Sequence, residues 1–187
     1  MSKRFGDKRV LGGLDLEVPR GGFVVLTGPN GSGKTTLLRL CAGLAAPTGG
    51  ELEIGVPRGQ IGFLGHAPLV YGELTGLENL DLYGRLYRLP ERRERAGAML
   101  ERFGLWRARN ERAGMYSRGM LQRLALCRTF LHDPDLLLLD EPFDGLDAEG
   151  AELLHAELDE RRAVTALVAT HDPEALGARA TARLALA

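Results

Sequence analysis

A glycine-rich segment near residue 30 has the residue types and the spacing of a phosphate-binding loop. It follows an apolar run at residues 23–26 and precedes a helical pattern at residues 37–44, so strand, loop and helix come in the order that the motif requires. In that geometry backbone N–H groups surround the phosphates, and the dipole of the following helix favours the anion. The phosphate-binding residues predicted in this way are Gly28, Pro29, Asn30, Gly31, Ser32, Gly33, Lys34, Thr35 and Thr36.

Four residues of this loop have defined chemical roles. Lys34 is the only lysine after Lys8, and its compact ammonium suits the β- and γ-phosphates, where a planar guanidinium would not. The Thr35 hydroxyl is the expected Mg²⁺ ligand, and Gly31 and Gly33 let the backbone approach the anion. A glycine-rich turn without a ligand is the alternative interpretation, which the flanking strand and helix disfavour.

A second cluster of candidate residues follows buried strands. The run Leu136–Leu139 is typical of a strand buried on both faces of a parallel sheet, and it ends in Asp140 and Glu141. Ligands of α/β sheets bind at this end of the strands. We therefore expect Asp140 to act on Mg²⁺ through water and Glu141 to be the base for an attacking water. His171 follows the apolar run 164–169, so it is expected to contact phosphate or water.

Composition limits the class of protein. The 187 residues include 24 basic and 25 acidic side chains, so the net charge gives no drive toward nucleic acid. No apolar run reaches the ~18 residues needed to span a bilayer, and the N-terminus lacks a signal-peptide core. We expect a cytoplasmic protein that reaches a membrane only through a partner. Cys41 and Cys127 lie on apolar helix positions and are expected to be core residues.

Hydrophobic periodicity predicts one α/β domain over residues 1–187, with a mainly parallel core sheet, a small antiparallel β portion near the N-terminus and an α-helical subdomain at about 70–134. The helical segment 85–112 is rich in arginine. This pattern indicates either a solvated helix face or a docking surface near a membrane partner. The expected strands include 10–18, 51–54, 61–64, 136–139 and 164–169, and the expected helices include 121–132 and 148–161.

The combined motifs resemble the ATP-binding subunit of ABC transporters over nearly the whole chain. The segments that carry this resemblance are 28–36, 116–120, 136–141, 145–147 and His171. It implies ATP and Mg²⁺ as cofactors, transmembrane permease subunits as partners, and a head-to-tail homodimer that encloses ATP. It also assigns roles to single residues: Phe5 stacks on adenine, Ser117 and Gly119 contact the γ-phosphate of the second copy's ATP, Asp147 crosses the dimer interface, and His171 holds the γ-phosphate and water. From its residue type alone, Phe5 could equally cap the sheet.

Three departures from that family pattern carry further expectations. The usual Leu-Ser-Gly-Gly-Gln signature is Tyr-Ser-Arg-Gly-Met here, which puts Arg118 and Met120 in the interface and predicts weaker or slower dimer closure. His66 stands where the family usually has a glutamine that contacts Mg²⁺. Because Mg²⁺ prefers oxygen ligands, His66 is expected to couple to the permease without binding the metal. The sequence begins almost at Lys3-Arg-Phe-Gly, a segment that a strand usually precedes in the family. Either that edge strand is missing or the chain start has been set late, and the adenine side of the site is expected to be looser.

The cargo is inferred from resemblance alone. Phe63–His66 and the run Leu74–Leu80 resemble the haem-exporter ATP-binding subunit of cytochrome c maturation, the CcmA group. The alternatives are the ATPase of another small exporter, for a drug, lipid or polysaccharide, and a soluble ABC protein that acts on DNA or ribosomes. The last of these usually carries a coiled-coil insertion or tandem ATPase domains, which this sequence lacks, and the chain has no basic footprint for nucleic acid.

Overall fold

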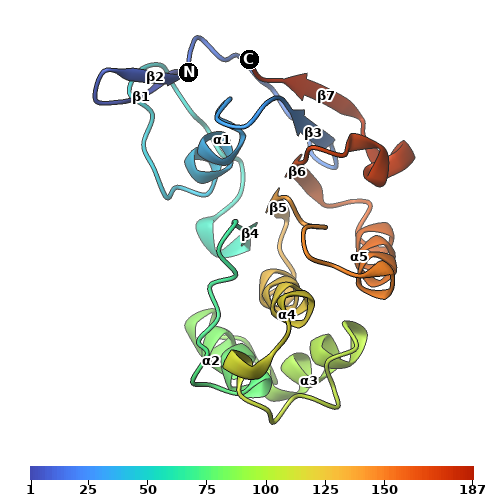
Figure 1. Cartoon of the computed structure of the whole chain (residues 1–187). Helices are drawn as coiled ribbons and strands as arrows, with labels where there is room; N and C mark the ends of the chain where they lie inside the picture. Colours follow the sequence, from blue (N-terminus) through green and yellow to red (C-terminus); the bar gives the residue numbers. More distant parts are fainter. The chain divides into compact units, whose positions relative to one another are not determined.

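The computed structural model describes all 187 residues and contains two β-sheets (Figure 1). The larger sheet has five strands in the order β4-β5-β6-β3-β7, and its β5–β6, β6–β3 and β3–β7 pairs are parallel. The smaller sheet is the antiparallel pair β1–β2. The predicted fold class is therefore confirmed. The strands are β1 (Lys3–Phe5), β2 (Lys8–Leu11), β3 (Phe23–Thr27), β4 (Ile61–Leu64), β5 (Leu136–Asp140), β6 (Thr165–Ala169) and β7 (Ala182–Ala185).

The helices comprise α-helices of 8 to 13 residues and shorter 3₁₀ segments. The five α-helices are α1 (Lys34–Cys41), α2 (Gly76–Leu86), α3 (Arg92–Arg102), α4 (Arg118–Phe130) and α5 (Ala148–Glu160). The three 3₁₀ segments are η1 (Arg58–Gln60), η2 (Ala113–Met115) and η3 (Pro173–Arg179). None of the helices is long and apolar enough to cross a membrane.

The chain forms two compact units, each built from segments that are distant in sequence. The first unit comprises residues 1–63, 135–141 and 162–187. The second comprises residues 64–134 and 142–161. The second unit therefore includes α5 as well as the helices between residues 70 and 134.

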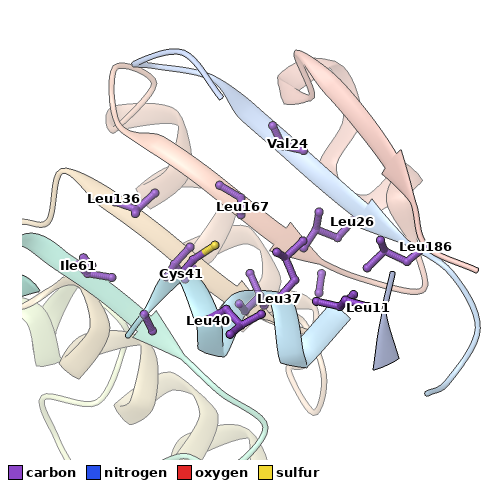
Figure 2. Packing of buried hydrophobic residues seen from close by; sticks show 14 residues of the cluster. Leu11, Val24, Leu26, Leu37, Leu40, Cys41, Ile61, Leu136, Leu167 and Leu186 are labelled. Atoms are coloured by element: carbon purple, nitrogen blue, oxygen red, sulfur yellow. The ribbon is translucent and has the colours of Figure 1, made fainter. Parts of the chain in front are cut away.

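The core of the first unit lies between α1 and the parallel strands. Figure 2 shows Leu37, Leu40 and Cys41 of α1 beside Leu136 of β5 and Leu167 of β6. The three α1 side chains recur at the spacing of one helix face, which is why this short helix buries them against the sheet. Burial raises the pKa of the Cys41 thiol to about 11. Cys127 in the second unit is also fully buried, so both cysteines are core residues as predicted.

Two expected strands differ in the structure. The strand expected at 10–18 forms only at its start, where residues 10 and 11 belong to β2, and the strand expected at 51–54 does not form. Residues 13–18 and 51–54 alternate apolar and acidic side chains, but neither segment forms a strand. Their half-buried apolar side chains line a cavity of about 480 Å³ in the first unit, and no backbone hydrogen bond joins one segment to the other. Alternation thus reports one buried face here, but strand pairing also needs a neighbour within hydrogen-bonding distance. Conversely, β7 was not predicted, and it pairs with β3 at the edge of the sheet.

Charged side chains hold the helices of the second unit together. Glu157 of α5 is fully buried and accepts bonds of 2.5 Å from both Arg102 and Arg161. Asp81 of α2 binds Arg85 at 2.8 Å and Arg92 at 2.7 Å. Burial alone would raise the pKa of Asp81, but these two guanidinium groups lower it below its usual value. Much of the arginine content of residues 85–112 therefore pairs within the unit, although other arginines of this stretch are exposed.

Candidate nucleotide-binding and catalytic site

Strand order brings three chain segments together at the carboxyl ends of the parallel strands in the first unit. Asp140 of β5 lies opposite Ala169 of β6, and Ala169 lies opposite Leu26 of β3. Because all three strands run in the same direction, the residues that follow them emerge together. These residues are the phosphate-binding loop after β3, Glu141 after β5, and Thr170 with His171 after β6.

The backbone of the loop explains the spacing of its glycines. Gly28 has a φ of +141° and Gly33 has a φ of +100°, both in a region that disfavours side chains. A Cβ on Gly28 would lie 2.2 Å from the carbonyl oxygen of Leu186, and a Cβ on Gly33 would lie 2.7 Å from Leu11 Cδ2. Both glycines are therefore required by conformation and by close packing.

Lys34 is the first residue of α1 and is buried at the base of the loop. Its Nζ donates hydrogen bonds to the carbonyl oxygens of Gly28 at 2.7 Å and Pro29 at 3.2 Å. These bonds hold the ammonium across the loop, beside the N-terminus of α1. A phosphate placed there would face a fixed cation and the positive end of the helix dipole.

A hydroxyl and a carboxylate that could hold Mg²⁺ join the loop to β5. The Thr35 hydroxyl donates to Asp140 Oδ2 at 2.7 Å. The carboxylate is buried at the end of the strand, and the hydroxyl belongs to the first turn of α1. A hydroxyl and a carboxylate are oxygen ligands of the kind that Mg²⁺ prefers, and this cation usually takes its other ligands from substrate phosphates and water. The two residues therefore fit Mg²⁺.

Glu141 and His171 form a bonded pair. Glu141 Oε2 accepts from the His171 backbone N–H at 3.2 Å and lies 2.9 Å from His171 Nδ1. Glu141 itself has a φ of +49°, an uncommon conformation for a residue with a side chain. Its backbone N–H donates to Ala169 O at 2.9 Å, which holds the strained turn in place.

Sequence reasoning missed the residues that orient His171. Thr170 is buried, and its hydroxyl accepts from the Asp172 backbone N–H at 3.0 Å. The Asp172 carboxylate in turn accepts from Ala175 N and caps η3. These bonds fix the turn on both sides of His171. A Thr-His-Asp-Pro sequence directly after an apolar strand was a visible signal, because Asp before Pro favours a helix cap.

Phe5 is the remaining predicted site residue of the first unit. It lies on β1 and is 55% exposed, with Lys3 Nζ 4.8 Å from the centre of its ring. The hairpin partner β2 ends at Leu11, which packs against Gly33 of the loop. An exposed ring on this hairpin has a face available for stacking.

The other predicted site residues belong to the second unit. Ser117 is the N-cap of α4 and accepts from Met120 N at 3.2 Å, and Asp147 is the N-cap of α5 and accepts from Gly150 N at 2.8 Å. Both residues thus have a local structural role. Arg118 and Gly119 begin α4, and α4 starts three residues earlier than the sequence predicted because Ser117 caps it. His66 is exposed just after β4.

A phosphate-binding loop between a central parallel strand and a helix, with an acidic pair at the end of a nearby strand, defines a P-loop nucleotide-binding protein. The finer class follows from comparison with known families. A family model described as ABC transporter matches residues 11–144, and the chain belongs to this family.

The relatives include one protein named for drug resistance and one named for import. The daunorubicin resistance ATP-binding protein DrrA3 of Streptomyces coeruleorubidus is 43% identical over 159 residues, which cover 79% of this chain and 50% of that protein. An aliphatic sulfonates import ATP-binding protein, SsuB of Burkholderia ambifaria, is 40% identical over 192 residues, which cover 96% of this chain and 58% of that protein. The chain therefore spans about half to three-fifths of the length of these relatives.

Solved structures agree with the family. The ATP-binding cassette MJ0796, in a dimeric post-hydrolysis state with ADP and Pi, matches with a TM-score of 0.84 and 30% identity. The match covers 99% of this chain and 90% of that one. The fold described above is thus the fold of an ABC ATP-binding cassette.

Proposed function

We propose that this chain is the ATP-binding and ATP-hydrolysing subunit of an ABC transporter. The observation that carries the proposal is the arrangement of the first unit: Lys34 held across the loop, Thr35 bonded to Asp140, and Glu141 bonded to His171. These are the parts that phosphoryl transfer to water requires, namely a phosphate cradle, a metal site and a base.

The residues divide the reaction between them. The backbone N–H groups of the loop and the Lys34 ammonium bind the β- and γ-phosphates, and Phe5 stacks on the adenine. Bound Mg²⁺ would neutralise phosphate charge, held by Thr35 directly and by Asp140 through water. Glu141 accepts the proton of the attacking water, and His171 orients the Glu141 carboxylate through the 2.9 Å contact.

The proposed active assembly is a homodimer that works with transmembrane permease subunits. Ser117, Arg118, Gly119 and Met120 of one copy would approach the ATP of the other, and Asp147 would lie at the interface. Support comes from the family match and from MJ0796, whose structure is a dimer bound to ADP and Pi. We further propose that the chain is cytoplasmic, sits at the inner face of the membrane through a permease contact that includes His66, and binds no nucleic acid.

A Glu141→Gln variant tests the catalytic proposal. Replacing a general base slows turnover by about 10²- to 10⁴-fold. The amide keeps the shape of the side chain, so ATP affinity should persist and an ATP-bound dimer should accumulate. The matched control is Glu174→Gln, which alters a carboxylate of the same unit with a side chain 83% exposed and should hydrolyse ATP normally. Turnover of Glu141→Gln near the wild-type rate would refute the role of Glu141.

A Lys34→Ala variant tests the phosphate-binding loop separately. Losing the ammonium removes a charge-assisted contact to phosphate, so nucleotide affinity should fall about tenfold or more. Isothermal titration with a non-hydrolysable ATP analogue measures this affinity without turnover. Unchanged affinity together with unchanged turnover would overturn the assignment of the loop.

Two cargo proposals are supported by different observations. His66 with the run Leu74–Leu80 favours haem export for cytochrome c maturation. The 43% identity to a daunorubicin resistance protein favours export of a drug-like molecule. Affinity purification from the native membrane, with the bound proteins identified, separates the two. Recovery of cytochrome c maturation proteins supports haem export, and recovery of an unrelated permease as the sole partner rules it out.

A further inference from the structure

An ion pair of the second unit joins the start of α4 to the turn that precedes α5. Arg118 Nη2 donates to Asp144 Oδ2 at 2.7 Å. The Arg118 side chain crosses Gly145, where an added Cβ would lie 3.0 Å from Arg118 Nε. The start of α4 also packs closely against this turn beside Arg118, since a Cβ on Gly119 would lie 3.0 Å from the Gly145 carbonyl oxygen. The position of the Arg118 guanidinium is therefore defined by Asp144.

The helix itself does not stabilise a cation at this position. Arg118 is the first residue of α4, and the first turn of that helix contains no acidic residue. Because the N-terminus of a helix carries partial positive charge, a guanidinium there is disfavoured unless an anion is nearby. Asp144 is the anion that the chain supplies.

The pair is exposed enough to be exchanged for another anion. The side chains of Arg118 and Asp144 are 75% and 41% exposed. Exposed ion pairs of this kind are weak. The guanidinium fork can bind a carboxylate or a phosphate through two oxygens, but a phosphate carries more negative charge. An ATP phosphate that reached Arg118 would therefore compete well with the carboxylate.

We propose that Asp144 is an intramolecular competitor of ATP for Arg118. This inference rests on the proposed function, in which the start of α4 of one copy meets the γ-phosphate of ATP on the other. When the dimer closes, Arg118 leaves Asp144 and binds the γ-phosphate. Asp144 thereby raises the ATP concentration needed for closure, and Arg118 is a binding residue for the nucleotide of the second copy.

The two residues should then have opposite effects, which a purely structural ion pair would not show. The measurement is the ATP concentration at half-maximal dimer formation, followed by analytical ultracentrifugation in a Glu141→Gln background that retains ATP. Asp144→Asn should lower this concentration about two- to fivefold, because the competing carboxylate is lost. Arg118→Ala should raise it about tenfold or more, because a charge-assisted contact to phosphate is lost. The double variant should match Arg118→Ala alone.

Controls distinguish the competition for Arg118 from a loss of folding and from a failure of the proposed function. Arg93→Ala removes another exposed arginine of the same unit, with a side chain 72% exposed, and should leave the midpoint unchanged. If Arg118→Ala unfolds, Arg118→Gln replaces it. The competition between Asp144 and ATP would be refuted if the Glu141→Gln background dimerises with ATP but the two single variants shift the half-maximal ATP concentration in the same direction, or if neither shifts it. Failure of the background itself to dimerise with ATP would instead refute the proposed dimer.

Discussion

Replacing Gly33 by alanine should damage the first unit far more than the same change at Gly31. Both glycines have positive φ angles, +100° and +86°. The left-handed region costs a residue with a Cβ about 1–2 kcal/mol. At Gly31 nothing lies within 4 Å of an added Cβ, so the conformational term acts alone. The expected loss for Gly31→Ala is therefore about 1–2 kcal/mol.

At Gly33 a steric term adds to the conformational one. The new Cβ would lie 2.7 Å from Leu11 Cδ2 and 3.1 Å from the Val10 carbonyl oxygen, and the second of these is backbone that cannot rotate away. Overpacking of this kind adds about 1–3 kcal/mol, so Gly33→Ala should cost about 2–5 kcal/mol in total. For a chain of this size the extra loss corresponds to a melting temperature lower by roughly 2–12 °C.

The assay is thermal unfolding of the two variants side by side, without nucleotide. Adding Leu11→Ala to Gly33→Ala tests the cause directly, because it removes the side chain that the new Cβ would meet. If the Leu11 contact produces the loss, the double variant will be more stable than the sum of the two single changes predicts. Equal melting temperatures for Gly31→Ala and Gly33→Ala would refute the steric reasoning.

Three further predictions concern groups buried outside the loop. Glu157→Ala should destabilise the second unit by about 1–3 kcal/mol in chemical unfolding, because Arg102 and Arg161 lose their buried carboxylate and keep only the exposed partners Glu160 and Asp133; a loss below about 0.5 kcal/mol would contradict this. The pKa of Asp81 is lowered on folding, so its ion pairs stabilise the protein at a pH above its unfolded pKa of about 3.9, and this stabilisation is lost as the pH falls through its folded pKa. In Asp81→Asn the free energy of unfolding should therefore depend less steeply on pH in the acid range, as measured by circular dichroism. Burial raises the pKa of Cys41 to about 11 and that of Cys127 well above its usual value, so neither should react with iodoacetamide at pH 8 until the chain unfolds, and rapid labelling of the native protein would contradict the packing.

The sequence alone determined the elements whose signals are local. The phosphate-binding loop was predictable because its chemistry depends on a contiguous run of glycines, Lys34 and Thr35 between a strand and a helix. The strand at Leu136–Leu139 was predictable because burial on both faces leaves an unbroken apolar run. Asp140 and Glu141 were recognisable as site candidates because they directly follow this buried strand, where two carboxylates need a cation or polar partners.

The tertiary structure alone decided which of these residues meet. The 2.7 Å contact of Thr35 with Asp140 joins residues 105 positions apart, and it depends on the packing of α1 against β5. The pairing of Glu141 with His171 depends on β5 and β6 being neighbours in register, and Arg118 with Asp144 depends on how α4 packs against a turn 26 positions later. The strand expected at 10–18, which ends at Leu11, and the strand expected at 51–54, which does not form, show the same limit. A side-chain pattern records which face is buried, whereas pairing and contact depend on which other segment lies alongside.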